Sequence, residues 1–196
     1  MKVWWILLPV ALWWLWPAAE RTHPPGQLAP EAPLQTPPSS TAAFPHGDFQ
    51  LTPLADFDIT ARVLARENYY FDSESELVKT DLALGWGVMS DSQVIDALEI
   101  SQSGRWYRWR TEQLPAPRRQ IETSSANMHI IPANDWVADD LADVRTGDVV
   151  EIRGHLVRAD GSNGWRWVSS LTRNDTGDGA CELVYARELR IVTPKH

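Results

Sequence analysis

The chain has 196 residues, of which 43% are hydrophobic and 22% are charged. This composition is typical of a globular domain and excludes a largely disordered protein. The formal net charge is −8, and most of the excess negative charge follows Asp48. Because surplus carboxylates oppose binding to a phosphate backbone, a general nucleic-acid binder is excluded and no nucleic acid is expected as a partner.

The first expected element is an uncharged apolar run, residues 3–19, which lies between Lys2 and Glu20. As a helix it would be about 25 Å long, slightly short of the roughly 30 Å hydrocarbon core of a bilayer. Tryptophan, which prefers the membrane interface, occurs near both ends of the run. We therefore expect residues 1–20 to form a hydrophobic helix that contacts the membrane through residues 3–19.

Two main fates of this helix stay open, beside a third interpretation as a buried core helix. A retained signal anchor would make a single-pass inner-membrane protein whose domain faces the periplasm. A cleaved signal peptide would release the domain into the periplasm, and Ala18 and Ala19 offer a small-residue cleavage region. Pro17 stands where such a site prefers a small residue, which favours the anchor. Both fates export the rest of the chain.

A proline-rich segment, residues 21–47, follows the apolar run. Proline at this density disfavours helices and sheet interiors and favours extended, semi-rigid chain. We expect residues 21–47 to be a linker that holds a folded domain, residues 48–196, away from the membrane. A proline-rich ligand for another domain is disfavoured, because no basic pattern flanks the prolines.

Five segments of the domain carry strand signals. Residues 57–63 and 150–156 alternate apolar and polar side chains, which is the pattern of a half-buried strand. The other three are rich in aromatic or β-branched residues and comprise residues 105–111, 165–170 and 181–192.

Two short helices are expected between these strands. Residues 90–93 read Ser-Asp-Ser-Gln, a capping box, and apolar residues follow from Val94 at helical spacing. Asn134 can cap a second helix, whose apolar stripe lies within residues 137–144.

Together the elements predict an α+β fold. Its centre would be a small antiparallel β-barrel (OB-like) with two short helices, preceded by the N-terminal hydrophobic helix and the Pro-rich linker. Gly154, in the middle of a predicted strand, would permit the sharp coiling that a five-stranded barrel needs.

Several segments carry a resemblance when taken together. They are LADFDITARVL (54–64), DLALGWG (81–87), ISQSGR (100–105), SANMH (125–129) and SLTRNDTG (170–177). Over most of the domain the chain resembles a group of bacterial envelope proteins labelled only as hypothetical. The resemblance implies a bacterial envelope protein, and it implies no activity and no site residues.

Cys181 is the only cysteine, so no disulfide can form within the chain. A buried small apolar side chain is the plainer interpretation. A catalytic thiolate would need a histidine beside it, and His129 and His155 are candidates by residue type alone. No catalytic residue is assigned, and these three side chains are kept as candidates for a Cys-dependent enzyme.

Motifs for metals and cofactors are missing from the sequence. It contains no His-Glu-x-x-His pair, P-loop, dinucleotide fingerprint or Gly-x-Ser-x-Gly elbow. The acidic loop at residues 174–182 departs from the calcium-binding EF-hand template at the twelfth position, Tyr185, and is expected to be a hairpin turn. No cofactor and no metal ligands are therefore expected.

The most unusual feature is Arg-Trp-Tyr-Arg-Trp-Arg at residues 105–110, together with Trp-Arg-Trp at residues 165–167. Arginine beside aromatic rings can stack on sugars or bases and pair with anions. In an opposing interpretation the Trp rings fill the barrel and the Arg side chains line its wet face. The expected binding residues are Arg105, Trp106, Arg108, Trp109, Arg110, Trp165 and Trp167.

We therefore expect a non-enzymatic, membrane-tethered periplasmic binding or accessory module. Its partner would be a protein or an envelope polymer. The alternative is a Cys-dependent hydrolase or transferase acting in the cell envelope, and the sequence leaves open whether the protein is an enzyme.

Overall fold

The computed structural model describes residues 20–172 and 181–193. The expected hydrophobic helix, residues 3–19, and most of the acidic loop, residues 174–180, lie outside the described residues. No helix within the described ranges is long and apolar enough to cross a membrane.

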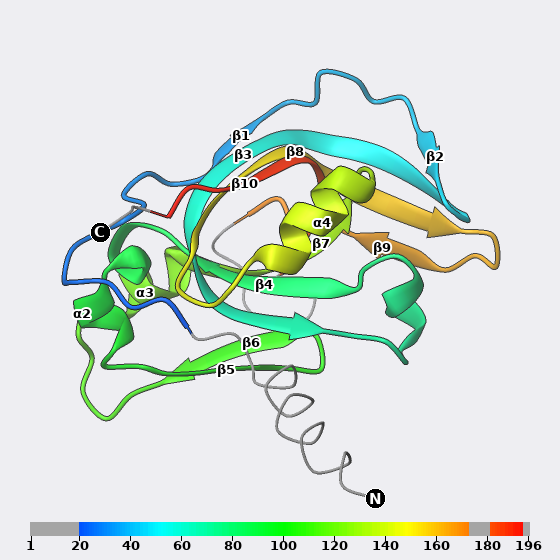
Figure 1. The fold of residues 1–196 in the computed structure, drawn as a ribbon. Helices are drawn as coiled ribbons and strands as arrows, with labels where there is room; N and C mark the ends of the chain where they lie inside the picture. Colours follow the sequence, from blue (N-terminus) through cyan, green and yellow to red (C-terminus); the bar gives the residue numbers. More distant parts are fainter. Residues whose placement is uncertain (1–19, 173–180, 194–196) are drawn as a thin grey trace, which may run out of the picture.

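The fold is mostly β, and five of its strands close into a ring (Figure 1). In order around the ring they are β3 (Phe49–Asn68), β4 (Thr80–Gly85), β7 (Ser125–Pro132), β10 (Glu182–Ile191) and β8 (Val149–Gly161), which pairs again with β3. The pairs are antiparallel except that of β7 and β10. This corrects the expected antiparallel sheet, because β10 lies between two strands of opposite direction and one of its contacts must be parallel.

The interior of the ring is apolar because side chains alternate between its two faces. Phe57, Ile59 and Val63 of β3 and Ile152 of β8 point inward and are buried in one cluster. The expected strands 57–63 and 150–156 are thereby confirmed as parts of β3 and β8.

Gly154 lies on β8 between Phe57 of β3 and Ala186 of β10, next to a bulge in β10. A Cβ at this position would be 1.9 Å from the backbone oxygen of Tyr185. Glycine is therefore required here by the close approach of two backbones.

Three short helices accompany the sheet within the described residues, one more than expected for the domain: α2 (Ser92–Ile95), α3 (Arg118–Thr123) and α4 (Asp135–Asp143). The second expected helix is confirmed as α4, since Asn134 accepts a hydrogen bond from the Val137 N–H. The cap of α2 differs from the prediction: Asp91 accepts the Gln93 N–H, because the Ser90 hydroxyl is buried and bonds to the backbone of Ala29 and Gly87 instead. Two 3-10 turns, η1 (Ser73–Glu76) and η2 (Gly87–Ser90), flank β4.

The two tryptophan-rich segments lie outside the ring. β5 (Glu99–Ser103) and β6 (Trp106–Arg110) form a separate hairpin, and β9 (Arg166–Val168) adds to the edge of β8. The predicted strands 105–111 and 165–170 are real but short. The interpretation that their Trp rings fill the ring is wrong, because side chains such as Leu82 and Ile130 already fill this narrow interior.

The proline-rich segment is extended, as predicted, but it lies against the domain. β1 (Leu34–Thr36) and β2 (Phe44–His46) both pair with β3. Ala29 is buried, and the Ser39 N–H donates to Asp56. Over residues 20–47 the expected spacer is therefore a strap that covers part of the sheet.

Candidate functional site

A cavity of about 320 Å³ lies on the outer face of the ring, beside β7 and β10. The hairpin turn before β6, the segment that includes β9, and η1 surround it. Its lining comprises Glu74, Arg105, Trp106, His129, Trp165, Arg166, Trp167, Val168 and Cys181. We call it the tryptophan cavity.

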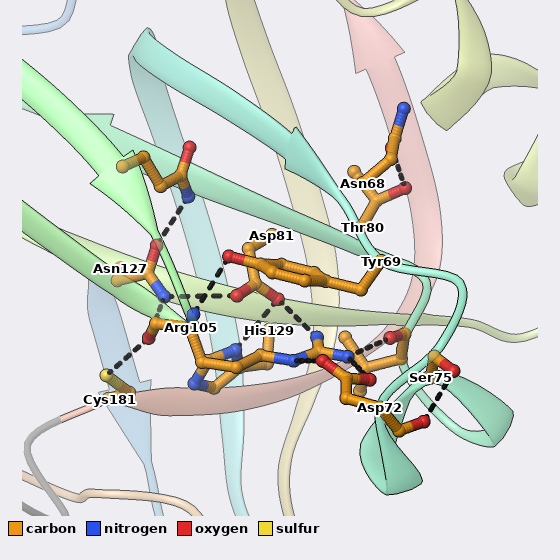
Figure 2. Close-up of polar contacts among 12 residues, drawn as sticks. Asn68, Tyr69, Asp72, Ser75, Thr80, Asp81, Arg105, Asn127, His129 and Cys181 are labelled. Carbon is orange, nitrogen blue, oxygen red and sulfur yellow. Dashed lines mark hydrogen bonds and ion pairs between the residues drawn. The ribbon is translucent and has the colours of Figure 1, made fainter.

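A buried carboxylate, Asp81, lies behind this cavity at the centre of a polar network (Figure 2). Its Oδ1 lies 2.8 Å from Nδ1 of His129 and 3.1 Å from a guanidinium nitrogen of Arg105. Asp81 and His129 are opposite each other on β4 and β7, so the strand register holds the carboxylate and the imidazole together. The Asn127 amide also donates to Asp81, at 3.4 Å.

Arg105 makes most of the other contacts in this network. Its guanidinium donates two hydrogen bonds to Asp72, at 3.0 and 2.8 Å, and one to the Val78 carbonyl at 2.9 Å. The same guanidinium stacks over the Tyr69 ring at 3.9 Å. The hydrogen-bonded Arg105 holds the pKa of the Asp72 carboxyl below its usual value.

The backbone of Arg105 is held as firmly as its side chain. Gly104 and Arg105 have φ values of 57° and 69°, the left-handed conformation of a tight hairpin turn. This conformation is uncommon outside glycine and costs free energy. The Tyr69 hydroxyl accepts a hydrogen bond from the Arg105 N–H at 2.9 Å, which fixes the strained turn against the residue that follows β3.

Indole rings form the walls of the cavity. Trp167 packs on the His129 ring with 4.5 Å between centroids, and Trp165 meets Trp167 edge-on at 6.0 Å. Phe49 also meets Trp165 edge-on, with 5.5 Å between ring centroids. Trp106, Trp165 and Trp167 are all partly exposed, and the ring contacts hold Trp165 and Trp167 in place.

The structure divides the seven expected binding residues into two groups. Arg105, Trp106, Trp165 and Trp167 line the tryptophan cavity, although the Arg105 guanidinium already has protein partners. Arg108, Trp109 and Arg110 lie further along the hairpin and do not line it.

The second group has other contacts. The Trp109 ring packs against a cluster on the outer side of β3 and β4, and Arg118 of α3 lies over it at 5.2 Å. Arg110 pairs with Glu99 across the hairpin, and Arg108 is exposed. Tyr107 lies on the same face of β6 as Trp109 and packs against the same cluster, and burial raises the pKa of Tyr107 to about 12.

The structure brings Cys181 and His129 to one cavity, which the sequence could not predict. The Cys181 sulfur lies 4.0 Å from the Arg105 carbonyl oxygen. His155 is elsewhere: its Nδ1 is 2.9 Å from Asp56, and both line another cavity of about 310 Å³ between β3 and β8.

Sequence reasoning missed Asp81, Asp72 and Tyr69, which fix the cavity in place. One signal could have pointed to Asp81, because a carboxylate at the start of the apolar run Leu82–Leu84 must be paired if the strand is buried. Asp72 and Tyr69 carry no such signal, since their partner lies more than thirty residues away.

Within residues 20–172 and 181–193 no three His, Cys, Asp or Glu side chains are grouped in a way that could hold a metal ion. Asp175 and Asp178 of the acidic loop lie outside these ranges. Comparisons of the chain with family models, with curated proteins and with solved structures found no match. The chemistry of the site therefore has to be argued from its own geometry.

Proposed function

We propose that the protein is a non-enzymatic binding module, tethered to the membrane and facing the periplasm, that holds an envelope polymer in the tryptophan cavity. The observation that carries this proposal is the set of three partly exposed indoles that line one cavity, two of them held by ring contacts. Fixed ring faces bind the flat faces of sugars with little loss of side-chain freedom. A protein partner is the other ligand class that such a surface suits.

The strand order also supports this location for the ligand. We assign the ring to the OB-like barrels, in which the second and third strands and two flanking loops bind oligosaccharides or oligonucleotides. Here the corresponding strands are β4 and β7, and the corresponding loops are residues 69–79 and, in its described part, residues 162–172. The net charge of −8 favours the sugar ligand over the nucleic acid.

The membrane tether rests on the apolar run at residues 3–19. We expect alkaline phosphatase, which is active only after export, to be active when fused after Gly47. The same fusion lacking residues 2–16 should be inactive, because the apolar residues supply the insertion energy. An inactive full-length fusion would contradict export.

Replacing Trp106 by alanine tests the binding function. Co-sedimentation of the full chain with protein-free bacterial cell-wall glycan should be weakened about tenfold, since a stacked ring contact is worth roughly 1–3 kcal/mol. Trp106 makes none of the ring contacts that join Trp165 to its neighbours, so its removal should leave the fold intact.

The matched control is Trp136→Ala, which removes an indole that is 81% exposed on α4 and does not line the cavity. It should co-sediment as the wild type does. Equal retention of the Trp106 variant and the wild type would remove the cavity from the proposed function.

One observation supports a second candidate, the Cys-dependent hydrolase or transferase. Cys181 and His129 line the same cavity, and Asp81 holds His129 in the way that a carboxylate orients a catalytic histidine. For a nucleophile we expect iodoacetamide to alkylate Cys181 faster in the folded protein than in urea, and His129→Gln to abolish the difference. Slower alkylation in the folded protein would exclude this candidate.

A further inference from the structure

A second cavity, of about 540 Å³, lies between α4 and the end of the ring formed by β3, β4 and β7. Leu77, Ile130, Ala138 and Leu141 provide apolar walls. Its volume is within the usual range for small-molecule sites, and it shares no lining residue with the tryptophan cavity. We call it the α4 cavity.

Arg66 enters this cavity from inside the ring. In the pairing of β3 with β4, Arg66 is opposite Leu82, and Leu82 is a fully buried member of the interior cluster. Opposite residues of two paired strands project to the same face of a sheet. The Arg66 side chain therefore begins on the apolar side of the ring, where a cation is unfavourable without a partner.

The Arg66 guanidinium has no such partner among the described residues. Its Nε atom is buried and makes no hydrogen bond. The buried Arg62 and the half-buried Arg105 differ in this respect: Arg62 donates to the Ser92 hydroxyl at 2.7 Å, and Arg105 pairs with two carboxylates. Burial lowers the pKa of Arg66, as expected for a cation without a compensating carboxylate.

Other polar groups of the lining suit an anion as well. Thr80 donates to Oδ1 of Asn68 at 2.8 Å, which leaves the Asn68 amide nitrogen as a donor, and Figure 2 shows it pointing away from Thr80. Lys79 also lines the cavity. Glu76 and Asp135 are the two carboxylates of the lining, and neither forms an ion pair with Arg66.

We propose that the α4 cavity binds a small organic anion whose carboxylate or phosphate pairs with Arg66 and whose apolar part packs against α4. The planar guanidinium matches the two oxygens of either group. This site is independent of the envelope polymer, so its failure and the failure of the tryptophan cavity are distinguishable.

The test uses the full chain in detergent and three small probes observed by ¹⁹F NMR. 4-Fluorobenzoate and 4-fluorophenyl phosphate carry the two candidate anions on one apolar ring, and 4-fluorobenzamide is their neutral counterpart. We expect at least one anion to bind and the amide to bind about tenfold more weakly or not at all, because charged hydrogen bonds contribute more than neutral ones. The anion that binds more tightly identifies the group.

Two variants assign the binding to this cavity. Arg66→Gln should lower the affinity for the anion about tenfold or more. Arg118→Gln, on the exposed side of α3, should leave this affinity unchanged. Ala138→Leu fills part of the cavity without changing charge, so it should weaken binding even if Arg66→Gln fails to fold. Binding of neither anion, equal binding of the amide, or unchanged binding in both cavity variants would overturn the proposal.

Discussion

Gly154→Ala is expected to destabilise the protein by about 3 kcal/mol, the upper part of the range for overpacked interiors. The new Cβ would be 1.9 Å from the Tyr185 carbonyl oxygen and 3.1 Å from the Arg187 backbone nitrogen. These are backbone atoms, so no side-chain rotation can relieve the clash. β8 and β10 would have to separate next to the bulge in β10.

Urea unfolding followed by tryptophan fluorescence measures this effect. Gly161→Ala, on the same strand, is the matched control, because the nearest atom to its Cβ would be the flexible Asn163 side chain at 3.3 Å. We expect this control to lie within about 1 kcal/mol of the wild type. If Gly154→Ala were equally mild, the close approach of β8 and β10 would not be the reason for glycine.

Asp81→Asn is expected to lower the free energy of unfolding by about 3–5 kcal/mol, the usual loss when one partner of a buried ion pair is removed. The substitution keeps the shape of the side chain and removes its charge. Arg105 would then keep one carboxylate instead of two, and His129 would lose its anionic partner in a place where its side chain is only 3% exposed. Water cannot replace the lost interactions at such a buried position.

Asp72→Asn is the matched control, because Asp72 pairs with the same arginine and its side chain is 32% exposed. Asp72→Asn should lower the free energy of unfolding by about 1 kcal/mol, because water can replace the lost ion pair at an accessible site. The two free energies of unfolding are compared by urea denaturation. Equal costs for the two variants would contradict the central place of Asp81 in the network.

The strands that the sequence predicted and those that it missed differ in how their faces are buried. β3 and β8 alternate because their inner face meets the core while much of their outer face meets solvent or polar side chains. β4 is buried at every residue and β7 at most of them, since the hairpin and β9 cover their outer face. A strand covered on both faces loses its period of two, so its pattern cannot be told from a helix or an irregular core segment.

The candidate site was predictable in its aromatic part. The concentration of Trp and Arg residues singled out Trp106, Trp165 and Trp167. Such a concentration can be recognised in the sequence without knowledge of the fold. The separation of Arg108 and Arg110 from these rings was not predictable, because it depends on the position of the hairpin outside the ring. The meeting of Cys181 with His129 likewise depends on the parallel pairing of β10 with β7.

The attachment of the strap to the domain limits how far the domain could lie from a membrane anchor at residues 3–19. Arg21 pairs with the buried Asp148, its N–H donates to the Thr146 carbonyl, and the absence of a Cβ at Gly147 makes room for its backbone. Had residues 21–47 been free and extended, they could have allowed a reach of about 80 Å at ~3.1 Å per residue. Because Arg21 is already bound to the domain, almost no free chain separates residues 3–19 from the ring. If residues 3–19 are the membrane anchor that we propose, this attachment keeps the ring close to the lipid headgroups. A polymer bound in the tryptophan cavity would then lie near the membrane surface.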